Sequence, residues 1–345
     1  MTVLRAAAVS VKLRPRSVAA GFVVLAVAVG CALLLLSTGD YPLSPGAALR
    51  AALGSGTPAD AYIVQELRAP RVVTALLAGA ALALAGAIFQ ALTRNPLGSP
   101  DVLGFTQGSA AGALLAIVVT GGGSLTLAAG ALVGGIVTGA GIYLLAVRHG
   151  SHGNHLVLVG IGVAAVLTGV NGYLFTRAEI TDASRAMLWL TGSLDGRGWE
   201  DALPLLAVLT VVGPIVLFGL SRPLSALALG DDQALALGVR VTPVRVSLLG
   251  AAVLLCSAAA AAAGPVAFVA LTAPQVARRI TGDPGPNLLS SLLVGAALMT
   301  AADLAAQRLV PGRDLPVGVL TGILGGAYLV WLLAARRRFS KGGRS

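Results

Sequence analysis

The sequence predicts an all-α polytopic membrane protein, and its composition and its long apolar runs carry this prediction. Of the 345 residues, 56% are hydrophobic and 11% are charged, whereas a soluble domain carries about 25% charged residues. The mean hydropathy is +0.88. Because about 20 apolar residues cross a bilayer as a helix, a chain of this length and composition is expected to cross it many times.

Ten apolar segments have spanning or nearly spanning length. The first follows four basic residues and faintly resembles a lipoprotein signal at Val29-Gly30-Cys31, but it is longer than a signal-peptide core, so we interpret it as an uncleaved helix. The segment 265–280 is short and is either a half-helix or a steeply packed span. The predicted segments are 18–36, 62–92, 101–119, 124–147, 155–177, 200–220, 243–263, 265–280, 287–309 and 317–336.

The distribution of basic residues predicts the orientation of these spans. With the N-terminus inside, 16 of the 24 Lys and Arg residues lie on the inner side and eight lie outside, as the positive-inside rule favours. The expected arrangement is N-in and C-in. Residues 1–345 then form one transmembrane domain with a cytoplasmic N-terminal segment 1–17, a cytoplasmic segment 221–242 and a basic tail 337–345.

Several function classes are disfavoured by the composition. The net charge of +10 comes with only 4% aromatic residues, so topology rather than nucleic acid explains it. Cys31 and Cys256 both lie in apolar runs and offer no disulfide framework or CxxC metal site. The histidines, His149, His152 and His155, share one Gly-containing loop without carboxylates, and we expect no metal there. No GxxxxGK[ST] motif or catalytic triad can be assembled, so the chain is predicted to be non-catalytic and without a cofactor of its own.

Small residues recur at helical spacing in the fourth predicted span. Gly130, Gly134, Gly135 and Gly139 are the kind of pattern that lets helix backbones approach closely in lipid. We expect this helix to pack tightly against its neighbours.

The inner segment 221–242 contains a predicted short helix. Asp231 and Asp232 stand at its start and Gly238 at its end, which agrees with the helix dipole and with a glycine C-cap. From the residues alone, this helix is either an ordinary connector or a docking element for a cytoplasmic partner.

Eight motifs in order give the chain a resemblance to the FecCD family of importer permeases over nearly its whole length. They are Arg68-Ala69-Pro70-Arg71 with Gly79-Ala80-Ala81-Leu82-Ala83, Gln90-Ala91-Leu92-Thr93-Arg94-Asn95-Pro96-Leu97, Asp101-Val102-Leu103-Gly104, Gly230-Asp231-Asp232 with Leu237-Gly238-Val239, Ala263-Gly264-Pro265-Val266-Ala267-Phe268-Val269, Ala273-Pro274-Gln275-Val276-Ala277-Arg278-Arg279, Ala302-Asp303-Leu304, and Leu315-Pro316-Val317-Gly318-Val319.

The resemblance implies the fold and the partners of a type II ATP-binding-cassette importer. It implies ten helices per subunit in the bacterial plasma (inner) membrane, a second permease copy that is identical or paralogous, a cytoplasmic ATPase dimer that binds ATP and magnesium, and an extracytoplasmic substrate-binding protein. The implied cargo is a ferric siderophore, with vitamin B12 or haem as alternatives. It also assigns ATPase coupling to Gly230, Asp231, Asp232, Ala234, Leu237 and Gly238.

Arginines on the predicted outer side have two interpretations. Arg68, Arg71 and Arg308 could each reach lipid headgroups by snorkelling. The resemblance instead implies that they meet acidic residues of the substrate-binding protein, with a one-residue shift in the alignment at Arg308.

The resemblance also indicates a translocation path and a gate. The fifth span would line the path, which makes Asn171 and Tyr173 path candidates, although interfacial decoration explains them equally. Ser151 and Asn154 are candidates for a cytoplasmic gate at the start of that span.

Asp303 is a carboxylate inside a predicted span. Such a group would suit an ion-coupled secondary transporter, the main alternative function. Because it falls in the Ala-Asp-Leu motif, we favour a structural carboxylate that is hydrogen-bonded within the bundle.

Overall fold

A computed structural model describes residues 2–6, 9–101, 103–121, 123–147, 153–310 and 314–341. Apart from one N-terminal hairpin, the regular structure of these residues is helical. In that hairpin, β1 (Thr2–Ala6) pairs antiparallel with β2 (Val9–Leu13). The hairpin lies within the segment 1–17, which the sequence predicts only as cytoplasmic.

The long helices match the predicted spans. Seven helical stretches of the described residues are long and apolar enough to cross a membrane, two further apolar helices are shorter, and α13 has 13 residues. The helices concerned are α1 (Pro15–Ser37), α4 (Ala69–Leu92), α5 (Phe105–Thr120), α6 (Ser124–Val147), α7 (Gly153–Arg177), α9 (Trp199–Pro214), α12 (Val241–Ala263), α13 (Val269–Thr281), α14 (Leu288–Arg308) and α15 (Val317–Lys341). The predicted all-α fold class is confirmed.

Short helices lie at the two ends of the bundle or extend the long ones. They are α2 (Pro45–Ala52), α3 (Pro58–Tyr62), α8 (Ile180–Leu190), α10 (Ser221–Leu229), α11 (Asp231–Ala236) and the π-helical η1 (Ile63–Arg68) and η2 (Ile215–Leu220). The sequence treats 178–199 as an outer loop, but the structure places α8 there, where it packs on α5.

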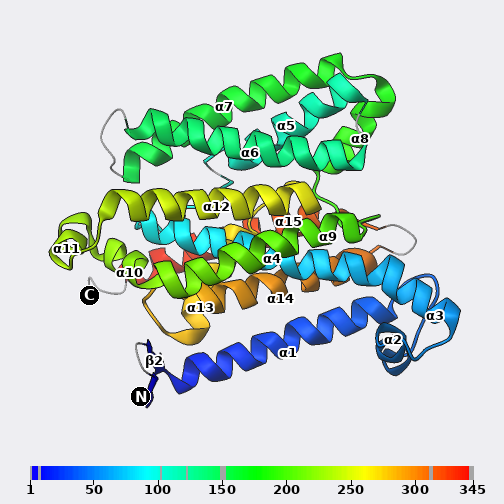
Figure 1. The fold of residues 1–345 in the computed structure, drawn as a ribbon, viewed down its shortest axis with the longest axis horizontal. Coiled ribbons are helices and arrows are strands. Elements are labelled where there is room, and N and C mark those ends of the chain that lie inside the picture. The colour runs from blue at the N-terminus through cyan, green and yellow to red at the C-terminus, as the bar shows by residue number, and fades with distance from the viewer. Residues whose placement is uncertain are drawn as a thin grey trace.

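The two ends of the bundle are distinct (Figure 1). The β1–β2 hairpin, α10 and α11 lie at one end, and α2, α3 and α8 lie at the other. We call these the inner and the outer end, following the orientation that the basic residues predict.

Helix α4 forms the centre of the bundle. It packs on α9, α12, α13 and α14, and every residue from Ala78 to Leu92 is buried. Glycines permit the closest approaches: a Cβ added at Gly79 would collide with the backbone of Gly295 in α14, and one at Gly86 would collide with the backbone of Ala270 in α13. Such contacts supply the dispersion attraction that holds helices together in lipid.

The glycines of α6 make the close contacts that their spacing predicts. Gly130 and Gly134 lie against the backbones of Gly112 and Gly108 in α5, and Gly139 faces the side chain of Val253 in α12. The small-residue prediction for this helix is confirmed.

Helix α13 starts within the bundle rather than at its outer end. Residues 264–268 are not helical, and Phe268 caps α13 with a φ of 68°. Its 13 residues reach about 20 Å at 1.5 Å per residue, less than the roughly 30 Å hydrocarbon core. Of the two alternatives for 265–280, the half-helix is correct.

Both π-helical segments lie just before a proline. The carbonyl groups of Glu66 in η1 and Gly219 in η2 stand four residues before Pro70 and Pro223. A proline ring clashes with that carbonyl in an α-helix, and the wider π turn relieves the clash.

Replacing Gly134 by Val tests the close α5–α6 packing. The added side chain would meet the Gly108 and Gly112 backbones, and we expect the free energy of unfolding to fall by about 1–3 kcal/mol. Thermal unfolding in detergent measures the effect. Gly141→Val in the same helix is the matched control, because nothing lies within 4 Å of its Cβ position. Equal melting temperatures for the two variants would contradict the packing described here.

Candidate functional site

The outer end is organised around a buried ion pair between α4 and α14. Arg71 donates from Nε to Asp303 Oδ2 at 3.1 Å and from Nη2 to Asp303 Oδ1 at 2.9 Å. The Asp303 side chain is 0% exposed. Gln307, one turn further along α14, donates to Asp303 Oδ2 at 3.0 Å. Both carboxylate oxygens are therefore engaged, as a buried charge requires.

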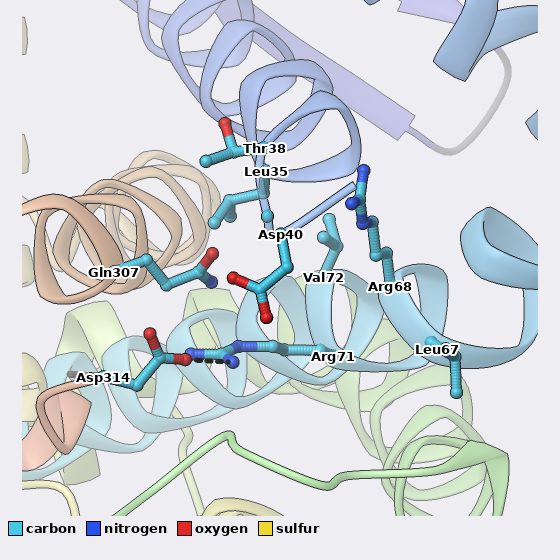
Figure 2. Close-up of a pocket in the computed structure, with 10 residues that line it drawn as sticks. Leu35, Thr38, Asp40, Leu67, Arg68, Arg71, Val72, Gln307 and Asp314 are labelled. Atoms are coloured by element: carbon cyan, nitrogen blue, oxygen red, sulfur yellow. Dashed lines mark hydrogen bonds and ion pairs between the residues drawn. The ribbon is translucent and has the colours of Figure 1, made fainter. Parts of the chain in front are cut away.

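The same arginine reaches two loop carboxylates. Its Nη1 lies 3.1 Å from Asp314 Oδ2 and 3.5 Å from Asp195 Oδ1. Figure 2 shows the guanidinium of Arg71 lying toward Asp314, with the Asp40 side chain above it. Arg71 thereby joins α4 and α14 to the segments before α9 and before α15.

Arg68 points away from Arg71 (Figure 2). It donates to the backbone oxygens of Leu36 at 2.8 Å and Tyr41 at 2.6 Å, at the end of α1. Arg308 also reaches this end of α1, where its Nη2 lies 2.6 Å from Thr38 Oγ1. The space between α1, α4 and α14 is a pocket of about 550 Å³ that both Arg68 and Arg71 line.

The three predicted docking arginines thus lie at one end of the molecule but in different environments. Arg71 is largely buried and paired with aspartates, Arg68 is half-buried, and Arg308 is exposed. Docking of a binding protein by these arginines remains a prediction. The geometry gives Arg71 a set of partners within the chain, so Arg68 and Arg308 are the better placed of the three for an external contact.

The path and gate candidates are separated by the fold. Asn171 is buried, and its Nδ2 donates to Gln107 Oε1 of α5 at 3.1 Å. Tyr173 is exposed on the surface of α7 and accepts a hydrogen bond from Arg177. Asn154 lies in the first turn of α7, and Ser151 lies outside the described residues. Their roles stay predictions.

At the inner end, segment 221–242 forms two helices rather than one. Helix α10 continues the line of η2, and α11 follows after Gly230. Gly230 has a φ of 135°, and a Cβ there would lie 2.6 Å from Gln233 Oε1. The chain leaves α11 through Gly238, at a φ of 79°. These are positions at which glycine avoids the strain that other residues meet.

Helix α11 divides the predicted coupling residues into two faces. Ala234 is fully buried in the main core, so it anchors the helix and is not available to a partner. Asp232 is exposed, and Leu235 and Leu237 are 59% and 66% exposed. We call Asp232, Leu235 and Leu237 the α11 surface.

Several functional candidates have no recognisable sequence pattern. Asp195, Asp314 and Gln307 join the Arg71 network from positions remote in sequence. Arg245 binds Asp231, although the sequence marks it only as an inner basic residue. The positions of charged residues along the sequence cannot reveal such pairs, because the pairs depend on which helices pack together.

Removing Arg71 should destabilise the protein strongly. In Arg71→Ala the buried Asp303 loses its counter-ion, which costs about 3–5 kcal/mol for a broken buried pair. We expect a lower melting temperature in detergent, and partial recovery in the double variant Arg71→Met with Asp303→Leu. The exposed Arg50 of α2 is the control, and Arg50→Ala should melt as the wild type does. An Arg71→Ala variant as stable as Arg50→Ala would contradict the role of the pair.

Comparison with known proteins identifies the same family along almost the whole chain. The model of the FecCD transport family matches residues 25–335. The ferric enterobactin transport system permease protein FepG of Escherichia coli is 42% identical over 303 residues, covering 88% of this chain and 92% of that protein. The Fe(3+) dicitrate transport system permease protein FecD of Escherichia coli is 39% identical, covering 92% and 98%.

A solved structure shares the fold. An inward-facing metal-chelate type ABC transporter superposes with a TM-score of 0.81 at 28% identity, covering 91% of this chain and 98% of that chain. The family resemblance read from the eight motifs is confirmed.

Proposed function

The chain belongs to the FecCD transport family, and from this premise we propose that it imports a ferric siderophore or a related iron chelate as the permease subunit of an ATP-binding-cassette importer. As a member of that family it is a non-catalytic transport subunit and a multi-pass protein of the bacterial plasma membrane. Two similar permeases act on ferric enterobactin and on ferric dicitrate, which supports an iron chelate over vitamin B12 or haem as cargo.

The observation that carries the proposal is the α11 surface. A polytopic membrane protein with two exposed leucines beside a carboxylate at its inner end offers an apolar contact to a cytoplasmic protein. No nucleotide-binding motif occurs in the chain itself. A separate ATPase dimer that binds ATP and magnesium would supply the energy, and it would dock on this surface.

In this mechanism, alternating access follows from differential contacts. A substrate-binding protein would dock at the outer end, where Arg68 and Arg308 offer positive charge, and ATP binding would close the ATPases against α11. Each partner shifts the permease only as far as its affinities for the two states differ. A second permease copy, identical or paralogous, would complete the path.

The geometry around Asp303 supports this proposal over an ion-coupled transporter. A proton or cation site must exchange its ion with water. Asp303 is fully buried, and Arg71 and Gln307 occupy both of its oxygens. The carboxylate is thus held as a structural partner of Arg71.

A pull-down from the native membrane tests the proposed function. We expect the tagged chain, in mild detergent, to retain an ABC ATPase, and we expect Leu235→Asp with Leu237→Asp to retain several-fold less because the apolar contact is lost. Leu309→Asp is the matched control, since Leu309 is 60% exposed at the outer end. Mass spectrometry also distinguishes an identical from a paralogous second permease. Recovery of the chain alone, even after crosslinking, would refute the importer and favour the secondary transporter.

Charge reversal at Arg68 tests the docking of a substrate-binding protein. Arg68→Glu and Arg308→Glu should each weaken capture of the cognate binding protein, and the loss should be largest at low ionic strength because salt screens exposed charges. Binding to the immobilised permease measures this. Arg50→Glu, an equal change at an exposed outer site, should have a smaller effect. Unchanged affinity at low salt would leave these arginines as lipid contacts.

A further inference from the structure

The two adjacent aspartates of α11 have different surroundings. Arg245, in the second turn of α12, places its Nη2 2.7 Å from Asp231 Oδ1 and 2.8 Å from Asp231 Oδ2. The Asp231 side chain is 35% exposed and the Arg245 side chain is 12% exposed. Asp232, by contrast, is exposed on the α11 surface. The motif Gly-Asp-Asp therefore contains one inward carboxylate and one outward carboxylate.

Helix α11 depends on such contacts for its orientation. It has six residues, and isolated helices shorter than about 12–15 residues are marginal in water. Flexible glycine positions, Gly230 and Gly238, flank it on both sides. Ala234, buried in the core, and the Asp231–Arg245 pair both hold α11 on the bundle.

Helix α12 leads from this pair to the outer end. Most of its residues from Leu248 to Ala263 are buried, so this stretch is packed within the bundle. Beyond its last residue, Gly264 lies against the carbonyl oxygen of Trp189, and the N–H of Gly318 donates to Gly192 O at 2.9 Å in the same group of turns. The turn at Gly192 thus connects the outer end of α12 to the start of α15.

We propose that Asp231 is a positioning residue that, through Arg245, links α11 mechanically to α12, while Asp232, Leu235 and Leu237 contact the ATPase. This inference rests on the proposed function, because it assigns a transmission route to the ATPase-facing helix. An ATPase that moves α11 then moves α12 with it. When the pair is broken, α11 still binds the ATPase, but its motion is taken up by the glycines at its two ends.

Amide hydrogen exchange on the assembled permease–ATPase complex tests the link without any cargo. We measure the change in exchange across Val241–Ala263 when ATP and vanadate are added. In Asp231→Ala and in Arg245→Ala, we expect this change to fall several-fold while the amount of ATPase retained stays at the wild-type level. The reversed pair, Asp231→Arg with Arg245→Asp, should recover most of the change in exchange, because it restores an ion pair between α11 and α12. If the single variants acted only by destabilising the protein, combining two substitutions would not restore the change.

The neighbouring carboxylate supplies the matched control. Asp232→Ala makes the same charge change as Asp231→Ala one residue away on the exposed face, so it should lower ATPase retention and leave the response of α12 intact in the complexes that form. A wild-type response in both Asp231→Ala and Arg245→Ala, no recovery in the reversed pair, or no ATP-dependent change in the wild-type complex would each overturn the link. Failure of the wild-type chain to retain any ATPase would instead overturn the proposed function.

Discussion

The close packing around α4 is the constraint on which the rest of the structure depends. In lipid there is no water to drive helices together, so they associate through van der Waals contact and internal hydrogen bonds. Along α4, Gly79 and Gly86 let the backbones of α14 and α13 occupy the space that a Cβ would fill. Because α4 is enclosed in this way, its long polar side chains Arg71 and Gln90 take their partners from neighbouring helices.

Those partners come from the helices that the small residues bring close. Gln90 of α4 donates to Leu271 O at 3.0 Å and accepts from Arg278, both on α13. At the outer end, Arg71 finds Asp303 because α14 lies directly against α4. Unsatisfied polar groups are costly in a membrane, so the same contacts that exclude lipid also fix the register of α4, α13 and α14.

The sequence predicts the spans well and the site only in part. Length and hydropathy give the helices, and the run from Gly264 to Phe268 marks the break before α13 because glycine and proline interrupt it. The helix α8 is missed, since its 11 residues are short and mixed in polarity. Asp231 and Asp232 look equivalent in the sequence. Only the position of Arg245 on α12 separates them, and that position depends on how α11 folds back.

The two arginine–aspartate pairs at opposite ends of the bundle differ in exposure, and this difference suits different tasks. Breaking the buried Arg71–Asp303 pair would leave a charge without solvent, so this pair holds α4 and α14 together. The Asp231–Arg245 pair is more exposed than the Arg71–Asp303 pair. Water and salt therefore screen its attraction more strongly. Such a pair can direct α11 onto α12 without freezing it, provided that Ala234 stays packed in the core. The α11–α12 end can therefore move while α4 and α14 stay together, which is what transmission from a cytoplasmic partner would require.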